Sequence, residues 1–317
     1  MALALEREKR RSHPIGRGVL CSSRRVKYAF IREHEREFRV SAMCRALEVG
    51  ASGYYRWRGR KPSARAAGNE RLVGKIGAAH AESRGIYGSP KVYRQLRREG
   101  ERVNHKRVER LMRENGLRAK RAKKSKRTTD SRHDLPVAEN VLARQFKAAR
   151  PDEVWASDIT YVWTLEGWLY LAVFLDLYSR LIVGWAVSED LSTEFVEAAF
   201  MQGQARRGAA VSPLIHSDRG SQYASAAFRK RLSAWGCSQS MSRKGNCWDN
   251  AVTESFFGVL KAEMVHHESF KTRREARDKL FDYIEVFYNR MRIHSAADYF
   301  APAEYEARYR AQLKEAA

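Results

Sequence analysis

The spacing of hydrophobic and polar positions changes near residue 150. Before that point, apolar residues recur three and four positions apart, as in "SPKVYRQLRREG", which predicts amphipathic helices. After it, "DEVWASDITYVW" alternates and is rich in Val, Ile, Thr, Tyr and Trp, which predicts a β-strand. The pattern therefore divides the chain into a helical first half and a mixed second half.

The first half contains two predicted helical pairs. In the first pair, Ser41 can cap a short helix, Gly50 ends it, and Ser52 can start a second helix with Tyr55 facing inward. Helix, glycine-containing turn and second helix with basic flanks form the outline of a helix-turn-helix. Any small helical hairpin gives the same pattern, so the outline alone is moderately specific.

The second pair ends in a helix with Asn104 as its cap and Gly116 as its stop. Its expected core positions are Val108, Leu111 and Met112, and its outward positions are Lys106, Arg107, Arg110 and Arg113. A solvated helix face usually mixes charge signs more evenly, so this face is predicted to contact DNA phosphates.

Beyond residue 150 the pattern predicts three strands, a helix, a strand, a helix, a strand and a helix, which describes an α/β domain with a mixed sheet. The last strand, "CSQSMS", is followed by the loop "RKGNCWDNA" and the amphipathic helix "VTESFFGVLKAEMVHH". Four tryptophans at strand spacing are expected in the core rather than as base-stacking platforms: Trp155, Trp163, Trp168 and Trp185.

Charge is distributed unevenly along the chain. The net charge is +23, and residues 1–150 hold 40 of the 60 Lys and Arg but only 15 of the 37 Asp and Glu. The first half is therefore about +25 and the second about −2, as expected for a polyanion-binding module fused to something else. Nucleic acid is favoured over membrane lipid, because no basic amphipathic anchor or lipidation signal is present.

Cysteine usage and hydropathy narrow the class of protein further. The four cysteines include no CxxC pair, which argues against disulfides and a zinc finger. The start "MALALEREKRR" lacks the apolar stretch of a signal peptide. The most apolar stretch is interrupted by Asp176, Ser179 and Arg180, so no membrane span is expected. A soluble protein of the reducing cytoplasm is therefore expected.

Three carboxylates are candidates for one site. Asp158 interrupts an apolar strand, Asp218 follows the buried strand "PLIHS", and Glu254 lies early on the helix that follows the last strand. If that helix packs on the sheet, the three meet, repel one another and ionise poorly. Hard oxygen ligands suit Mg²⁺ or Mn²⁺, and two such ions about 4 Å apart can clamp the oxygens of a phosphodiester. The alternative for Asp218 is that it caps a turn.

Nearby polar residues have simpler interpretations. Asp176 in "FLDLYSR" is predicted to stabilise a hairpin turn. Asp249 and Asn250 are predicted to cap the helix that carries Glu254, although Asn250 can also reach the site. His216 is predicted to be hydrogen-bonded within the core rather than beside metal ions.

The local sequences "SDITYV", "HSDRGSQY" and "GNCWDNAVTESFFGVLKAE", with 59 and 35 residues between the three acids, resemble the DDE catalytic core of retroviral integrases and insertion-sequence transposases. The nearest resemblance is to the second-frame product (OrfB) of the IS-three family, from about Ile31 onward. "YGSPKVYRQLRREG" and "NHKRVERLMRENGL" resemble that family's helix-turn-helix region, and "YIEVFYNRMRIHS" resembles its tail. Its tail more often has a Leu-Gly pair where this chain has "SAADYFAP".

The resemblance implies an RNase H-like fold and a DNA transposase. Asp158, Asp218 and Glu254 match the family's metal-holding acids, and Lys261 matches a basic residue that contacts DNA. The implied activity is hydrolytic cleavage at the terminal inverted repeats, then attack of the freed 3′-hydroxyl on target DNA. The implied partners are a first-frame OrfA product, separate or fused, and further copies of the chain on paired DNA ends. No heptad run precedes Ile31, so the zipper of the first-frame product is not expected in this chain.

These inferences give a fold class and a domain plan. The expected fold is α/β, an RNase H-like mixed five-stranded sheet flanked by helices and preceded by an all-α helix-turn-helix region. The expected segments are a basic arm (1–30), a helical DNA-binding region (31–118), a basic linker (119–150), the catalytic core (151–270) and a helical tail (271–317). Two other functions remain open: a non-catalytic DNA-binding regulator of transposition, and an RNase H-type nuclease.

Overall fold

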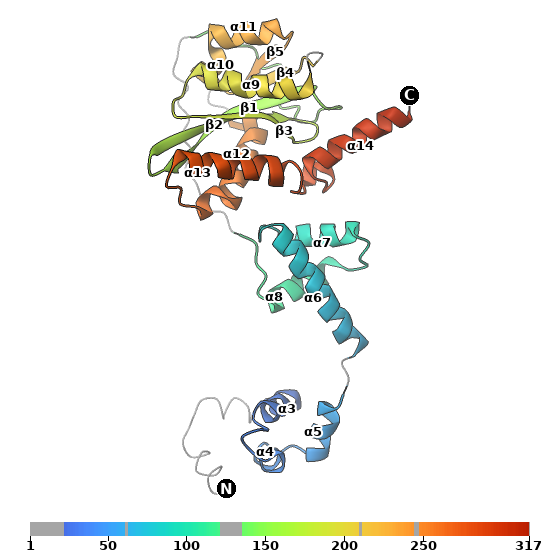
Figure 1. Ribbon diagram of the computed structural model, residues 1–317. Helices are drawn as coiled ribbons and strands as arrows, with labels where there is room; N and C mark the ends of the chain where they lie inside the picture. The colour runs from blue at the N-terminus through green and yellow to red at the C-terminus, as the bar shows by residue number, and fades with distance from the viewer. Residues whose placement is uncertain (1–21, 61–62, 121–134, 209–210, 244–246, 317) are drawn as a thin grey trace. The chain divides into compact units, whose positions relative to one another are not determined.

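The computed structural model describes residues 22–60, 63–120, 135–208, 211–243 and 247–316 (Figure 1). The chain divides into two compact units, Met1–Leu72 and Val73–Ala317. Most of the expected basic arm and about half of the expected linker lie outside the described residues.

The first unit contains three short helices around a small core. They are α3 (Arg24–Glu33), α4 (Val40–Ala46) and α5 (Ala51–Arg58). The core consists of Ile31, Met43, Cys44, Leu47 and Tyr54. The predicted helical pair is present, but its details differ from the prediction.

Two of the predicted positions in this pair are wrong. Arg39, rather than Ser41, occupies the N-cap of α4, and Gly50 rather than Ser52 precedes α5. The earlier start of α5 changes which tyrosine faces the core. Tyr54 is fully buried and donates a 2.7 Å hydrogen bond to Glu35, whereas Tyr55 is 53% exposed.

The second helical pair forms as predicted. It comprises α7 (Ser89–Arg98) and α8 (His105–Glu114), preceded by the long helix α6 (Ala64–Glu82). The Asn104 side chain accepts a 2.8 Å hydrogen bond from the Arg107 backbone N–H and so caps α8. Gly116 ends the turn after α8 with φ +69°, a conformation that favours glycine. The predicted core positions Val108, Leu111 and Met112 are buried.

The sheet has five strands in the order β3-β2-β1-β4-β5. They are β1 (Val154–Thr164), β2 (Gly167–Asp176), β3 (Ile182–Ser188), β4 (Leu214–Ser217) and β5 (Ser238–Met241). The first three are antiparallel neighbours, while β4 runs parallel to β1 and to β5. The predicted mixed five-stranded sheet is confirmed.

Helices cover both faces of the sheet (Figure 1). One face is covered by α9 (Thr193–Arg207), α10 (Ser221–Ala224) and α11 (Ala226–Ala234), and the other by α12 (Ala251–Glu263) and α13 (Arg273–Phe281). Close packing of α9 depends on Gly184 in β3, where a Cβ atom would lie 2.1 Å from the carbonyl oxygen of Ala199. Any side chain at that position would push the helix off the sheet.

The tryptophan prediction is half wrong. Trp155 is fully buried and Trp185 is 8% exposed, but Trp163 and Trp168 are 55% and 43% exposed. The last two lie near the end of the long β1–β2 hairpin, where β4 no longer flanks β1, because the β1–β4 pairing covers only Val154 to Ala156. Strand spacing identified the strand, but it could not show where the covering helices end.

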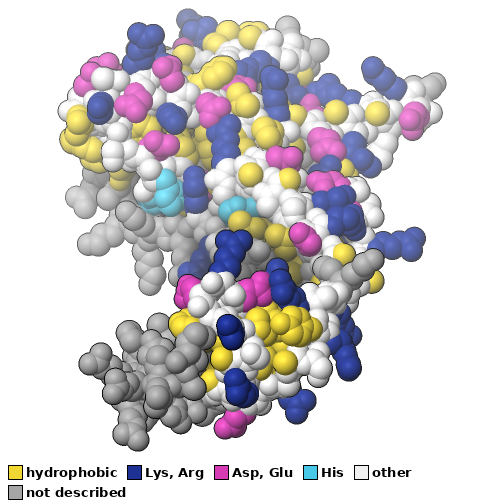
Figure 2. All heavy atoms as spheres, turned by 60° about the horizontal axis from the view of Figure 1, so that its bottom comes forward, with side chains coloured by type: hydrophobic (Ala, Val, Ile, Leu, Met, Phe, Trp, Pro, Cys, Tyr) yellow, Lys and Arg dark blue, Asp and Glu magenta, His cyan; other side chains and the backbone are white. Residues whose placement is uncertain are grey.

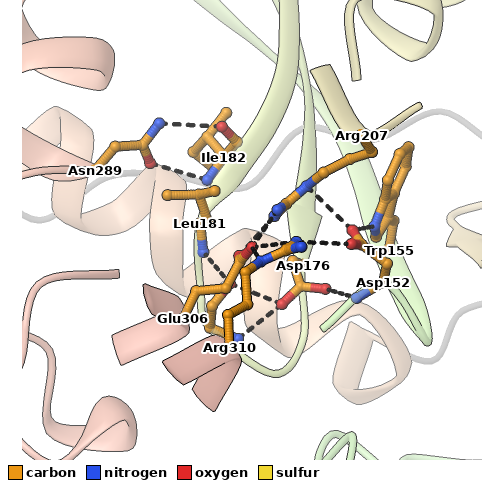
Figure 3. A network of polar contacts seen from close by, with 10 residues as sticks. Asp152, Trp155, Asp176, Leu181, Ile182, Arg207, Asn289, Glu306 and Arg310 are labelled. Carbon is orange, nitrogen blue, oxygen red and sulfur yellow. Dashed lines mark hydrogen bonds and ion pairs between the residues drawn. The ribbon is translucent and has the colours of Figure 1, made fainter. Parts of the chain in front are cut away.

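The C-terminal segment packs back onto the sheet. After α13 the chain continues as a π-helix (Asp282–Tyr288) and ends in α14 (Pro302–Glu315). Figure 3 shows a polar network at this contact, here called the ion-pair cluster, which consists of Asp152, Asp176, Arg207, Glu306 and Arg310. Glu306 of α14 pairs with Arg207 of α9, and both side chains are less than a tenth exposed. No helix among the described residues has the length and apolarity that a membrane span requires.

Candidate active site

The strand register places Asp158 and Asp218 side by side. In the parallel β1–β4 pair, Ala156 lies opposite His216. Asp158 lies two residues beyond Ala156 in β1, and Asp218 lies two residues beyond His216, just after β4 ends at Ser217. The charge of Asp218 contributes to the raised pKa of Asp158, so the two side chains lie close together. The two acids that the sequence separates by 59 residues are therefore neighbours in space.

Glu254 joins them from the helix. It lies in the first turn of α12, and α12 packs against β1. Asn250, at the N-cap of α12, directs its amide nitrogen toward the Ser157 carbonyl oxygen, 3.5 Å away. Asp158, Asp218 and Glu254, here called the acidic triad, thus converge from two strands and one helix, and all three are partly exposed.

The pKa of Asp158 is affected by the charges of the other two acids. Burial and the negative charges of Asp218 and Glu254 raise the pKa of Asp158 well above its ordinary value, against the opposing effects of the Ile159 N–H and Lys261. Burial, followed by the charges of Asp158 and Asp218, likewise raises the pKa of the Tyr223 hydroxyl, which hydrogen-bonds to Ser157 at 2.8 Å. The negative charges of the three acids are therefore concentrated around Asp158, where Lys261 acts against them.

Short backbone hydrogen bonds orient two of the carboxylates. Asp158 Oδ1 accepts from the Ile159 N–H at 2.8 Å, and Asp218 Oδ1 accepts from the Gly220 N–H at 2.9 Å. A Cβ atom on Gly220 would lie 3.1 Å from that same Asp218 oxygen. The glycine therefore allows the backbone to approach the carboxylate closely, and Asp218 does stabilise a turn in addition to any role in the site.

The donor set fits a hard divalent cation. Carboxylate oxygens are the ligands that Mg²⁺ and Mn²⁺ prefer, and a cation would offset the repulsion that raises the pKa of Asp158. The Asn250 side-chain oxygen adds a buried acceptor that has no hydrogen-bond partner. Across the described ranges, however, no three His, Cys, Asp or Glu side chains are already arranged to hold an ion. The acidic triad would have to contract around it.

The predicted DNA-contact residues lie in two places. Lys261 extends from α12 over the ring of Tyr161, 4.9 Å from its centroid, and burial lowers the pKa of Lys261. The other four lie on α8, where Lys106 and Arg113 are exposed and Arg107 and Arg110 are partly buried. Arg110 also pairs with Glu114 one turn along, at 2.8 Å.

The turn before α12 is held by a group that the sequence did not reveal. Asp249 is fully buried and its two carboxylate oxygens accept hydrogen bonds from Arg243, Arg144 and Asn140 at 2.8–3.0 Å. The hydrogen bonds from Arg243 hold the pKa of Asp249 well below its ordinary value. The prediction that Asp249 caps α12 is wrong. Asn250 does occupy the N-cap, but its side chain makes no capping hydrogen bond.

His216 stabilises the same turn through a hydrogen bond to its backbone. Its Nε2–H donates to the Asp249 carbonyl oxygen at 2.8 Å, and its Nδ1 lies 2.9 Å from the Ser240 hydroxyl. Burial lowers the pKa of His216, so the neutral ring with its proton on Nε2 is the form that fits both contacts. The prediction of a hydrogen-bonded core histidine is confirmed.

Comparison with known proteins identifies the family. The chain is 41% identical over 283 residues to "Transposase InsF for insertion sequence IS3A" of Escherichia coli, covering 89% of this chain and 98% of that protein. The chain belongs to this family of insertion-sequence transposases. It is also 43% identical over 268 residues to the "Insertion element IS600 uncharacterized 31 kDa protein" of Shigella sonnei, covering 84% and 98% of the two chains.

Domain-level matches agree with the architecture. Residues 148–247 and 254–309 each match a family described as integrase core domain, and residues 68–125 match an HTH-like domain. Among solved structures, the HTLV-2 integrase catalytic core domain matches with a TM-score of 0.39 and 14% identity, over 50% of this chain and 99% of that one. The family and domain matches make this chain an enzyme of the transposase and integrase type, with an integrase core and a helix-turn-helix-like region.

Proposed function

We propose that this transposase cleaves DNA at the ends of its insertion element and joins the freed 3′-hydroxyl to target DNA, with the acidic triad as its reactive centre. The proposal is carried by one observation: β1, the turn after β4 and the first turn of α12 bring Asp158, Asp218 and Glu254 together, and their charges, with burial, raise the pKa of Asp158. An acid in this setting costs folding free energy unless a cation joins it. A protein retains such an arrangement for what it binds.

Asp158, Asp218 and Glu254 would hold two Mg²⁺ or Mn²⁺ ions. Bound there, the ions would activate the attacking hydroxyl and stabilise the leaving oxygen of the phosphodiester. The chain itself fixes the geometry, because the Ile159 and Gly220 N–H groups orient two carboxylates and α12 carries the third. Lys261, next to Asp158, supplies a positive charge for a DNA phosphate.

The helical region is proposed to bind double-stranded DNA, which comprises the terminal inverted repeats and the target DNA. Lys106, Arg107, Arg110 and Arg113 of α8 would contact phosphates. We propose the same segmentation as above, with residues 31–118 binding DNA, 119–150 linking, 151–270 catalysing and 271–317 forming the tail. Two DNA ends must be joined, so the transposase would act as an oligomer, with or fused to a first-frame partner.

A strand-transfer assay tests the reaction. The purified full chain is mixed with labelled, pre-cleaved element-end DNA and Mn²⁺, with Asp158→Asn as the inactive comparison. Joined products that disappear in the variant are expected. Products that form only when the upstream region is fused would make this chain the catalytic half of a larger enzyme. DNA binding without joining in every arrangement would favour a regulator, and nicking without joining would favour a nuclease.

The proposed phosphate contacts have their own test. Lys106→Ala and Arg113→Ala should each reduce the slope of log binding constant against log salt concentration by about 1, because each removes one displaced counterion. Arg110→Ala should change the slope less, because Glu114 already compensates part of the Arg110 charge. Unchanged slopes in all three variants would place DNA elsewhere.

A further inference from the structure

Asn250 stands where asparagine usually caps a helix, but it does not cap α12. It is the N-cap residue of that helix, and its side chain makes no capping hydrogen bond. The residue is 5% exposed, and its buried amide oxygen has no hydrogen-bond partner. A buried acceptor without a partner costs free energy, because its hydrogen bonds to water are lost on folding. The ordinary role of an N-cap asparagine therefore does not account for this side chain.

The amide of Asn250 contacts the strand that carries Asp158. Its nitrogen donates to the carbonyl oxygen of Ser157, which immediately precedes Asp158 in β1, at 3.5 Å. A carbonyl oxygen can only accept, so the nitrogen is the end of the amide that faces Ser157. The oxygen without a partner is therefore the other end of an amide that is already held against β1.

The other two acids are close to Asn250 along the chain or through its neighbour. Glu254 follows Asn250 by four residues, about one turn of α12, which brings both to the same side of the helix. Asp249, the residue before Asn250, accepts at its carbonyl oxygen from His216, which lies two residues before Asp218. Asn250 therefore lies where the three elements that carry the acidic triad meet.

Gln204 provides a comparison within the same fold. Its buried side-chain oxygen also has no hydrogen-bond partner. Gln204 lies on α9, which covers the face of the sheet opposite α12, and its nitrogen is 3.4 Å from the sulfur of Cys237. An unpartnered amide oxygen is thus tolerated in the core by itself, and what distinguishes the oxygen of Asn250 is its position among three carboxylates.

We propose that the amide oxygen of Asn250 is a further ligand oxygen for the divalent cation of the acidic triad. This inference rests on the proposed function, since it adds a residue to the ion site that the proposed reaction requires. Amide carbonyl oxygens are hard ligands that suit Mg²⁺ and Mn²⁺. Because the amide is neutral, it adds an oxygen without adding to the negative charge around Asp158.

The test measures Mn²⁺ binding to the metal-free full chain without DNA, from the loss of the electron paramagnetic resonance signal of the free ion. Asn250→Ala should bind Mn²⁺ about 10-fold more weakly, the scale for losing a residue that supports a metal site. Asn250→Asp should restore the affinity or exceed it, because it returns an oxygen and adds a negative charge. The Tm of metal-free Asn250→Ala should stay unchanged, since the oxygen that it removes has no partner.

Gln204→Met is the matched control, because it removes the other unpartnered amide oxygen, far from α12, and should leave the Mn²⁺ affinity unchanged. Unchanged affinity in both Asn250 variants, or an equal loss in Gln204→Met, would overturn the assignment. A lower metal-free Tm with unchanged affinity in Asn250→Ala would make Asn250 a structural residue. Loss of binding in Asp158→Asn but not in Asn250→Ala would overturn this inference alone, whereas no binding by the unmodified chain would contradict the proposed ion site as well.

Discussion

Asp158 of the acidic triad and Asp176 of the ion-pair cluster lie on the paired strands β1 and β2 but in different surroundings. In the antiparallel register, Asp176 lies opposite Trp155 while Asp158 lies opposite Val173. The two acids therefore leave opposite faces of the sheet and are separated by three residues, about 10 Å, along β1. The ion-pair cluster contains two arginines for three acids, whereas Lys261 is the cation that acts on Asp158 in the triad.

Hydrogen bonding separates the two groups as well. Asp176 accepts from the backbone N–H and hydroxyl of Ser179 and from the Asp152 N–H at 2.7–2.8 Å, as expected for the hairpin-stabilising role that the sequence predicted. Asp158 accepts one short bond, from the Ile159 N–H, and experiences two other carboxylates. Arginines lie against Asp152 and Glu306 in the ion-pair cluster. Asp158 instead experiences the charges of two other carboxylates, which favours the binding of an external cation.

The largest expected effect is on the reaction. Asp158→Asn, Asp218→Ala and Glu254→Gln should each reduce strand transfer by about 100- to 1000-fold or more, the scale for losing a group that stabilises transition-state charge. Affinity for DNA should change little, because the basic residues lie elsewhere. Rates and DNA affinity are measured in parallel, with Glu197→Gln on the opposite face of the sheet as the control. Metal-dependent joining retained by any triad variant would refute the site.

The next effect is on stability and concerns the ion-pair cluster. Glu306→Gln should lower the free energy of unfolding by about 3 kcal/mol, because it leaves the nearly buried guanidinium of Arg207 with only Asp152 as a partner. Thermal unfolding measures this. Glu304→Gln is the matched control on the same helix: its pair with Arg98 is exposed, so the loss should stay below about 1 kcal/mol.

The stability difference between Glu306→Gln and the unmodified chain should also depend on pH. Burial acts to raise the pKa of Glu306, but Arg207 and Arg310 outweigh it and hold the pKa below its ordinary value of 4.5. A lowered pKa stabilises the fold above the ordinary value, and the stabilisation is lost as the pH falls through the lowered one. The difference should therefore be full at neutral pH and shrink below about pH 4.5. A constant difference across that range would point to packing rather than charge.

The third effect, of intermediate size, is the stabilisation of the fold by a bound metal ion, which should depend on the acidic triad and not on the ion-pair cluster. Mg²⁺ at about 100 times its dissociation constant should stabilise the folded chain by about 2.7 kcal/mol, seen as a rise in Tm. Glu306→Gln should retain this response although its starting Tm is lower. Asp158→Asn should lose most of it. An equal response in Asp158→Asn and the unmodified chain would mean that the ion binds somewhere else.

The smallest effect is a gain in stability: Asp158→Asn should raise the free energy of unfolding, which Glu306→Gln lowers. In metal-free protein, Asp158→Asn should raise the free energy of unfolding by about 1 kcal/mol, because it removes a charge that burial and two carboxylates disfavour. Asparagine keeps the oxygen that accepts from the Ile159 N–H. A gain of about 2–4 °C in Tm is expected. A loss of stability would show that Asp158 is held by favourable contacts, as Asp176 is.

Local pattern was sufficient to predict the order and type of the main elements in outline. Alternation and β-branched residues located the first strand, short apolar or polar runs between turns and helices located the others, and the position of Asp158 in an apolar strand singled it out. β1, which contains Asp158, and β4, which Asp218 follows, are parallel neighbours, and Glu254 lies on a helix packed against β1. These features are encoded within a few residues of each position.

Features that depend on distant partners were not predictable. Asp249 looked like a helix cap, because nothing near it in sequence shows that Arg144, 105 residues earlier, would bind it. Trp163 and Trp168 follow the same strand pattern as Trp155, but their exposure depends on where β4 stops flanking β1. Tyr54 rather than Tyr55 faces the core, and the N-cap of α5 is Gly50, two residues before the predicted cap Ser52.

The most direct test of the contrast between the two acidic groups is a crystal structure of the transposase grown with Mn²⁺, with anomalous scattering used to locate the ions. The account predicts anomalous peaks between Asp158, Asp218 and Glu254, with carboxylate oxygens about 2.0–2.2 Å from the ion, as hard divalent cations require. It predicts no peak among Asp152, Asp176 and Glu306. Peaks in the ion-pair cluster, or a saturated crystal with none at the acidic triad, would contradict it.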